Sequence, residues 1–352
     1  MKMEQIQEKK KHTRRKNLML IICIFLLIVL FFTDILAGSV FIPIKDVFHA
    51  LTGNAVSPEH KTIILSFRLP KALTAVLTGA ALSISGLQMQ TIFRNPLAGP
   101  YVLGISSGAS LGVAVLILGY SSVFSISLIS GLGNWSVVAA AWIGAGLILF
   151  LVLIVSVRIK NVITILILGI MFGAAVSSIV NILQYFSDES LLKSFVVWTM
   201  GSLGNISASQ VKILAATIII GIFIAFFSSG ILNALLLGET QAKSIGVNIR
   251  VARVLVFLST SILAGSVTAF CGPIGFIGIA VPHITRMLFQ TANHYRLIPG
   301  CLLTGAIIML ISDIIAQMPG YQTVLPINSV TAIIGVPVVI WIILRNYRIT
   351  RE

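Results

Sequence analysis

Apolar runs long enough to cross a lipid bilayer recur along the whole chain, and this feature limits the fold more than any other. The runs at 18–37, 136–156 and 208–228 each hold about twenty mostly apolar residues, the length that a membrane-spanning helix needs. Only 10% of the 352 residues are charged, too few for the surface of a soluble protein of this length. Because a helix satisfies its own backbone hydrogen bonds in lipid, we expect an all-α integral membrane protein.

Ten spans can be read from the apolar pattern, and they are expected to form a compact bundle. The eighth is short for a straight crossing of the bilayer. An even number of spans places both ends of the chain on the same side of the membrane. The expected spans are 18–37, 70–92, 102–119, 136–156, 162–186, 208–228, 251–271, 275–289, 297–317 and 329–345.

The net charge of +14 is concentrated beside the spans, which argues against nucleic-acid binding. A basic cluster precedes the first span, and arginines follow the last one, as the positive-inside rule expects of cytoplasmic flanks. We therefore expect a basic cytoplasmic tail at 1–17, a transmembrane domain at 18–345 and a cytoplasmic tail at 346–352. The first apolar run is long for a signal peptide, and an uncleaved first helix is the favoured interpretation.

The sequence carries no pattern of an enzyme or of a metal site. Cys23, Cys271 and Cys301 lie in apolar segments without CxxC spacing and are interpreted as small buried residues. The chain has no P-loop, HExxH or GxSxG motif. We expect a subunit with no cofactor and no ATP site of its own.

Two segments of the chain resemble each other and suggest an inverted repeat. Lys71 precedes Gly86 by fifteen positions, Arg250 precedes Gly265 by the same spacing, and a Pro/Gly-rich break follows each glycine. The two spans run in opposite directions in the expected topology. Opposed repeats with interrupted helices near the pathway are a recurring plan of transporters. Small residues spaced by four, such as Ala75, Gly79 and Ser83, also favour close helix packing.

The two breaks are candidates for a role in a transport pathway or its gating, and tight turns are the plainer interpretation. Irregular backbone at membrane depth is tolerated only inside protein or beside a water-filled cavity. The breaks are expected on opposite faces of the membrane. The candidate residues are Asn95, Pro96, Gly99, Pro100 and Ser106 in the first break and Gly272, Pro273 and Gly275 in the second.

The segment 235–250, between the sixth and seventh spans, is a candidate docking helix for a soluble partner on the cytoplasmic side. Gly238, Ala242 and Gly246 fall at i, i+4 and i+8, so they are predicted to share one bare helical face. Glu239 is one of only ten acidic residues. A loop helix tucked under the bundle is the alternative.

Three charged residues lie where charge is unexpected. Arg68 and Lys71 precede the second span on the outer side, against the positive-inside bias, so an acidic partner outside or snorkelling to headgroups would explain them. Asp313 lies deep in the ninth span without an obvious basic partner, and intramembrane acids are functional candidates. For His283, a structural role is favoured over metal ligation.

Several segments together resemble the FecCD family, the membrane permeases of ABC importers for iron-siderophores, haem and vitamin B12. The resemblance covers about 68–345. Its motifs are RLPKALTAVLTGAALSISGLQMQTIFRNPLAGPYVLGISSGAS, LGETQAKSIGV, CGPIGFIGIAVPHITR, IPGC and LPINSVTAIIGVPVVIWIIL.

The resemblance implies a multi-pass inner-membrane subunit that pairs with a second permease, as a homodimer or heterodimer, around a dimeric pathway. It also implies two copies of an ABC ATPase subunit below and a periplasmic or lipid-anchored substrate-binding protein outside. ATP hydrolysis in the partner would then alternate the bundle between outward and inward openings. Ferric siderophore, haem and corrinoid all remain open as substrate.

The resemblance assigns roles residue by residue. The segment with Gly238, Glu239, Ala242 and Gly246 matches the ATPase-coupling segment of the family. Arg68 and Lys71 match its outer basic pair, with Lys71 in place of the usual arginine, and Gln317 lies near a position that is basic in some members. The outer cavity is expected near Trp198, Met200 and Gly201. An ion-coupled secondary carrier using Asp313 is the alternative function.

Overall fold

The computed structural model describes residues 2–119, 134–159, 161–318 and 323–349, and it contains only helices and their connections in these ranges. Within these ranges, eight helical segments are long and apolar enough to cross a membrane, and two shorter apolar helices lie at Ile105–Ile117 and Ile277–Phe289. These two match the third and eighth expected spans. The all-α membrane fold is therefore confirmed.

The helices follow the expected spans closely, with short helices added between them. The longer ones are α1 (Lys2–Leu36), α4 (Leu69–Phe93), α5 (Ile105–Ile117), α8 (Asn134–Arg158), α9 (Val162–Tyr185), α11 (Ala208–Phe227), α14 (Ile249–Cys271), α15 (Ile277–Phe289), α16 (His294–Ala316) and α17 (Ile327–Ile349). The short ones are α2 (Ile44–Thr52), α3 (Pro58–Thr62), η1 (Ile63–Arg68), η2 (Pro100–Leu103), α10 (Glu189–Thr199), α12 (Ser229–Leu236) and α13 (Glu239–Ser244).

Three boundaries differ from the sequence expectation. The second span begins at Pro58, because α3 and the π-helical turn η1 continue into α4 without a break. Residues 2–17 belong to α1, and residues 346–349 belong to α17. The two proposed tails are therefore largely helical extensions of the first and last spans, and residues 350–352 lie outside the described residues.

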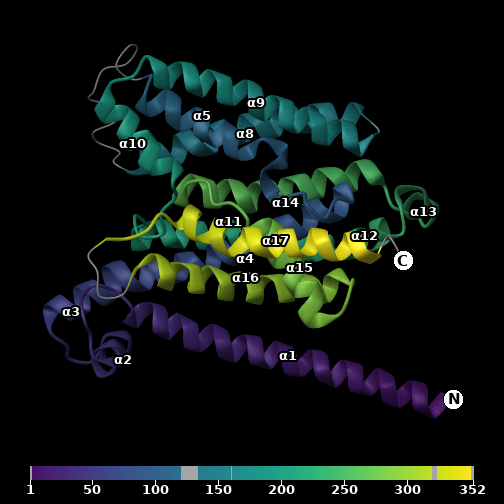
Figure 1. Cartoon of the computed structure of the whole chain (residues 1–352), viewed down its shortest axis with the longest axis horizontal. Helices are drawn as coiled ribbons and strands as arrows, with labels where there is room; N and C mark the ends of the chain where they lie inside the picture. Colours follow the sequence, from purple (N-terminus) through teal and green to yellow (C-terminus); the bar gives the residue numbers. More distant parts are fainter. Residues whose placement is uncertain (1, 120–133, 160, 319–322, 350–352) are drawn as a thin grey trace.

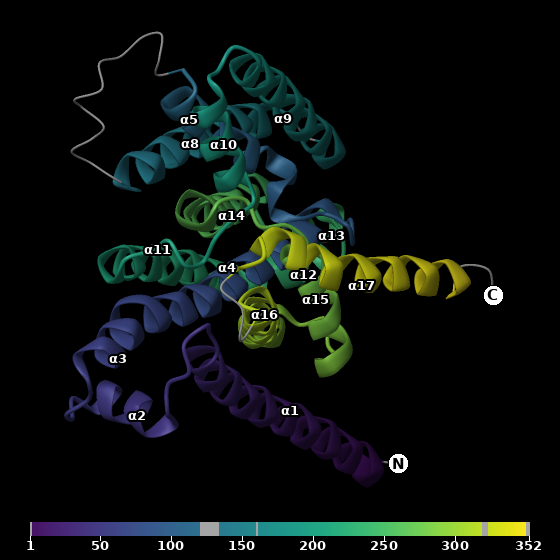
Figure 2. The same cartoon turned by 60° about the vertical axis from the view of Figure 1, so that its left-hand side comes forward.

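The helices α4 and α14 form the centre of the bundle. In the apolar windows of the 58–93 and 249–271 spans, 83% and 78% of residues are buried, against 17% in each of the spans of α1 and α9. Figures 1 and 2 show α1 and α9 on opposite flanks, with α4, α14 and α16 between them. The flanking spans thus leave apolar surface for lipid or other subunits.

Small residues allow the central helices to touch. A Cβ at Gly79 would overlap the carbonyl of Gly305 in α16, and one at Gly86 would overlap the carbonyl of Gly278 in α15. The Ser83 hydroxyl donates to the carbonyl of Cys301 at 2.7 Å. The predicted small face of α4 is therefore a packing face against α16.

The short helices gather at the two ends of the bundle. The helices α2, α3 and α10 lie at one end, which we call the α2 end, and α12 and α13 lie at the other, which we call the α13 end (Figure 1). The start of α1 and the end of α17 both lie toward the α13 end (Figure 1). This arrangement agrees with an even number of crossings.

The expected repeat has a structural counterpart, and the two breaks begin at opposite ends of the bundle, since α4 ends beside Leu235 of α12 and α14 ends beside Trp198 of α10. Each break joins a long helix to one of 13 residues, α4 to α5 and α14 to α15. The first break turns back into the bundle, where Pro100 packs against Gly278 of α15. The breaks therefore meet each other, because the connection after α4 runs back along α15.

Candidate functional site

The helix predicted over 235–250 is divided into α12 and α13, and the expected face of small residues does not form. Gly238 has φ +119° and precedes α13, and Gly246 has φ +90° and follows it. The glycines thus end the helix at both sides, since this backbone region disfavours other residues. Ala242 is fully buried and packs with Leu235 and Ile249, so it faces the bundle and not a partner.

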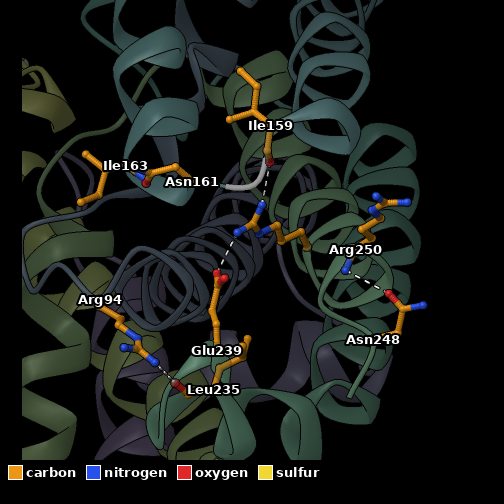
Figure 3. A network of polar contacts seen from close by, with 9 residues as sticks. Arg94, Ile159, Asn161, Ile163, Leu235, Glu239, Asn248 and Arg250 are labelled. Atoms are coloured by element: carbon orange, nitrogen blue, oxygen red, sulfur yellow. Dashed lines mark hydrogen bonds and ion pairs between the residues drawn. The ribbon is translucent and has the colours of Figure 1, made fainter. Parts of the chain in front are cut away.

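Glu239, labelled in Figure 3, connects α13 to the rest of the bundle through Arg253 of α14. A guanidinium nitrogen of Arg253 lies 2.8 Å from a Glu239 carboxylate oxygen, and another donates to the carbonyl of Ile159 at 3.0 Å. The Arg253 side chain is almost completely buried, whereas that of Glu239 is partly exposed. One guanidinium therefore joins α13, α14 and the end of α8.

A second arginine holds the segment from the other side. Arg94, which follows α4, donates to the carbonyl of Leu235 at 3.1 Å (Figure 3). The end of the central helix α4 is thus attached to α12, which leads into α13, and α13 itself is attached to the start of α14.

The second break is held by side chains from two other parts of the chain. The hydroxyl of Tyr101, in η2, accepts a hydrogen bond from the backbone N–H of Ile274 at 3.3 Å. The side-chain oxygen of Asn328, at the start of α17, accepts one from the N–H of Gly275 at 2.9 Å.

Trp198, Met200 and Gly201 lie beside this break. Gly201 has φ +75°, and Ser202 N–H donates to the Cys271 carbonyl at 2.8 Å. Trp198 lines a cavity of about 210 Å³ together with Ser194, Ser202 and Phe270. The expected group is therefore assembled around the end of α14, and its role in the pathway stays a prediction.

The other residues of the breaks have structural partners. Asn95 caps its own turn by accepting from the N–H of Leu97 at 2.9 Å. His283 donates to the carbonyl of Pro96 at 2.8 Å, which gives this histidine the structural partner that was expected. Gly99 faces Ile279, and Ser106 is half-buried in the first turn of α5. Gly272 and Pro273 complete the turn between α14 and α15.

Arg68 is turned into the protein at the α2 end. Its side chain donates to the carbonyls of Ile35 at 2.9 Å and Leu36 at 3.0 Å, and also to that of Val40. These carbonyls belong to the last turn of α1 and the segment after it. Arg68 therefore satisfies carbonyls that the end of a helix leaves without partners.

Asp313 has a basic partner, contrary to the sequence analysis. Its carboxylate lies 3.2 Å from the ammonium of Lys71. The side-chain amide of Gln317 donates to Asp313 at 3.1 Å and to Asp34 at 2.8 Å. Asp34, in the first span, is a second buried intramembrane acid, and it was not among the expected candidates. Its position inside an apolar run was the available signal.

No group of three or more metal-ligating side chains comes together in the part of the chain that the structure describes. The candidate residues instead lie in three separate groups. One is the α13 segment, the second is the meeting point of the breaks, and the third is the charged cluster at the α2 end.

The sequence matches the FecCD transport family over residues 26–345. The chain is 37% identical over 300 residues to the hemin transport system permease protein HmuU of Yersinia pestis, which covers 85% of this chain and 88% of that protein. It is 36% identical over 297 residues to the vitamin B12 import system permease protein BtuC of Salmonella typhi, with coverage of 84% and 88%.

A solved structure has the same fold. It is described as an inward-facing conformation of a metal-chelate type ABC transporter, and it superposes with a TM-score of 0.79 at 30% identity over 93% of this chain and 98% of that one. A more distant structure, PsaBC from Streptococcus pneumoniae in complex with Fab, shares the fold at a TM-score of 0.51 and 16% identity over 84% and 94%. The chain described here is a member of the FecCD transport family and a multi-pass membrane permease.

Proposed function

We propose that this chain is the permease subunit of an ATP-driven importer that carries a metal chelate across the cytoplasmic membrane. The observation that carries this proposal is the family match over 26–345, together with a shared fold along 93% of the chain. The substrate is a ferric siderophore, haem or a corrinoid. Relatives that transport hemin and vitamin B12 support this class.

The partners are assigned to the two ends of the bundle. Two copies of an ATPase subunit bind at the α13 end, where Glu239 and the 238–246 segment couple ATP hydrolysis to movement of α4 and α14. A periplasmic or lipid-anchored binding protein docks at the α2 end. A second copy of this chain completes the pathway, and both chain termini are cytoplasmic.

For the outer basic pair, the proposed docking of the binding protein rests on Lys71 and not on Arg68. Arg68 is engaged by the carbonyls after α1 and acts as a support. Lys71 keeps 17% of its side chain exposed, so it is the member of the pair that an acidic group of the binding protein can reach. As a lysine it contributes a point charge and not a bidentate contact.

The alternative function, an ion-coupled carrier working through Asp313, is not favoured. Membership of a family of importer permeases argues against it, and Asp313 is already paired with Lys71 inside the subunit. A transported ion would have to compete with that ammonium for the carboxylate.

Uptake by cells that lack this protein tests the proposal. Labelled ferric siderophore, haem and cobalamin are supplied in parallel, with ATP depletion of the wild-type cells as a control. Loss of one ATP-dependent uptake would identify the substrate. Unchanged uptake of all three in cells without a redundant importer would contradict the metal-chelate assignment. Uptake that is lost in these cells but survives ATP depletion in the wild type would favour the carrier.

A further inference from the structure

The short helix α2 has an exposed apolar face. It begins after Pro43 and ends before Gly53, whose φ of +78° lets the chain turn. Its nine residues are too few to cross a bilayer. Large apolar side chains are nevertheless exposed along it, namely Ile44, Phe48 and Leu51 in the helix and Phe41 just before it. Such a cluster marks an interaction surface, and the proposed function gives it no role.

The side chains of α2 divide into three sectors around the helix axis. Successive residues are rotated by about 100° in an α-helix, so Ile44, Phe48 and Leu51 project from one side. The sector on one flank of this apolar face is directed into the protein, because Val47 and Ala50 are buried. The sector on the other flank is polar and exposed, with Lys45, His49 and Thr52. The apolar face therefore lies between the protein and a polar surface, the order found in a helix at a membrane interface.

The contact of α2 with α1 places this face at the depth of the membrane edge. The ring of Phe48 stacks on that of Phe32 in α1, with 5.5 Å between the ring centroids. The apolar span of α1 has 20 residues and ends at Leu36, and a helix of this length matches the hydrocarbon thickness of about 30 Å. Because Phe32 lies one turn before the end of that span, Phe48 lies at the boundary of the hydrocarbon layer.

The apolar face of α2 also continues the outward face of α1. The exposed side chains of Ile21, Phe25 and Ile28 follow the same helical spacing as Phe32, so they form one stripe along α1. The helix α10, beside which the pathway is expected, lies on the other side of the bundle from α1 (Figures 1 and 2). A second copy that joins this chain around that pathway would leave the stripe on α1 to lipid.

We propose that α2 is an interfacial helix that inserts its apolar face into the outer leaflet of the membrane. Helices of this kind lie in the membrane plane, with the apolar face about 5–10 Å into the boundary between headgroups and acyl chains. Lys45 then lies at the level of the headgroups, where its ammonium stays in water while its stem covers apolar surface. The lipid surface is thus the partner of this face.

The side of α2 opposite the apolar face is fastened to α3. The carboxylate of Asp46 lies 2.6 Å from a ring nitrogen of His60, and Asp46 projects away from the apolar sector. Lys71, the residue proposed to meet the binding protein, lies in α4, and it is separated from the apolar face by the buried cluster that includes Val47 and Ala72. Membrane insertion of α2 therefore holds the outer end of α1 and the start of the second span at the membrane surface.

The test measures the depth of single spin labels on the full-length permease alone in lipid nanodiscs, so it depends on neither the substrate nor a partner. A nitroxide is attached at Ile44→Cys or Phe41→Cys for the apolar face and at His49→Cys as the matched polar position. Phe41 is 88% exposed, so its replacement leaves the core intact if Ile44→Cys does not fold. The unaltered chain, whose three cysteines are buried, gives the labelling background.

The readout is the collision rate of each label with oxygen, which concentrates in lipid, divided by that with a water-soluble nickel chelate. We expect this ratio to be severalfold higher for Ile44→Cys and Phe41→Cys than for His49→Cys. Equal ratios, with the chelate reaching all three labels, would overturn the proposal. Labels on the apolar face that are open to the chelate in nanodiscs, but protected when the binding protein is added, would show that this face docks a protein and not lipid.

Discussion

The ammonium of Lys71 lies 3.2 Å from a carboxylate oxygen of Asp313, joining the start of α4 to the end of α16. Gln317 connects the same carboxylate to Asp34 at the end of α1. The ammonium of Lys71 therefore faces one of two carboxyl groups, those of Asp313 and Asp34, which the side-chain amide of Gln317 bridges. This relationship fastens the peripheral first helix to the centre of the bundle.

Replacing Lys71 by methionine should destabilise the subunit strongly, because it leaves Asp313 and Asp34 buried without the ammonium. Breaking a buried ion pair by removing one partner typically costs about 3–5 kcal/mol. Thermal unfolding of the purified permease measures the effect. Lys61→Met, in the exposed part of α3, is the control and should change the midpoint little. Equal midpoints for the two variants would show that the pair carries no stability.

The variant Asp313→Asn distinguishes an ATP-driven permease from an ion-coupled carrier. Asparagine keeps the shape of the side chain and an oxygen that can accept from Gln317, so the local packing is retained. We expect ATP-dependent uptake to persist in this variant at a level that follows its abundance in the membrane. A fully folded variant without uptake would instead make Asp313 part of the transport step.

Two glycines should respond to alanine in opposite directions. Gly79→Ala places a Cβ into the carbonyl of Gly305 and should separate α4 from α16, at a cost of at least about 1–3 kcal/mol. Gly146→Ala meets no atom within 4 Å, and it should stabilise α8 by up to about 1 kcal/mol through helix propensity. Unfolding midpoints that move in the same direction would contradict this packing argument.

The sequence is sufficient to predict the spans, because each is a local property of some twenty residues. Even the two short helices at 105–117 and 277–289 appear as the third and eighth apolar runs. The repeat of a long helix, a break and a short helix is also visible in the spacing from Lys71 to Gly86 and from Arg250 to Gly265. These features require no knowledge of which helices are neighbours.

The partners of the charged residues could not be predicted, because they depend on contacts between distant segments. Lys71 and Asp313 are separated by more than two hundred positions, and only the packing of α4 against α16 brings them together. The meeting of Tyr101 with Ile274 has the same cause. At 238–246, spacing alone predicted a continuous helical face. The positive φ angles of Gly238 and Gly246 depend on the fold around them.

Glu239→Gln should uncouple α13 from the bundle without unfolding it. The change removes the carboxylate from the Arg253 guanidinium, which keeps its bond to the Ile159 carbonyl. In proteoliposomes with the ATPase and binding protein, we expect more ATP hydrolysed per substrate transported. Glu189→Gln, at the start of α10, is the matched control and should leave this ratio unchanged.

Arg253→Lys should also raise the amount of ATP hydrolysed per substrate transported. One ammonium cannot replace a guanidinium that reaches both Glu239 and the Ile159 carbonyl. The double variant with Glu239→Gln should then add little to either single change, since both interrupt one connection between α13 and the end of α8. Independent, additive effects would mean that α13 acts on the bundle by another route, such as the contact of Arg94 with Leu235.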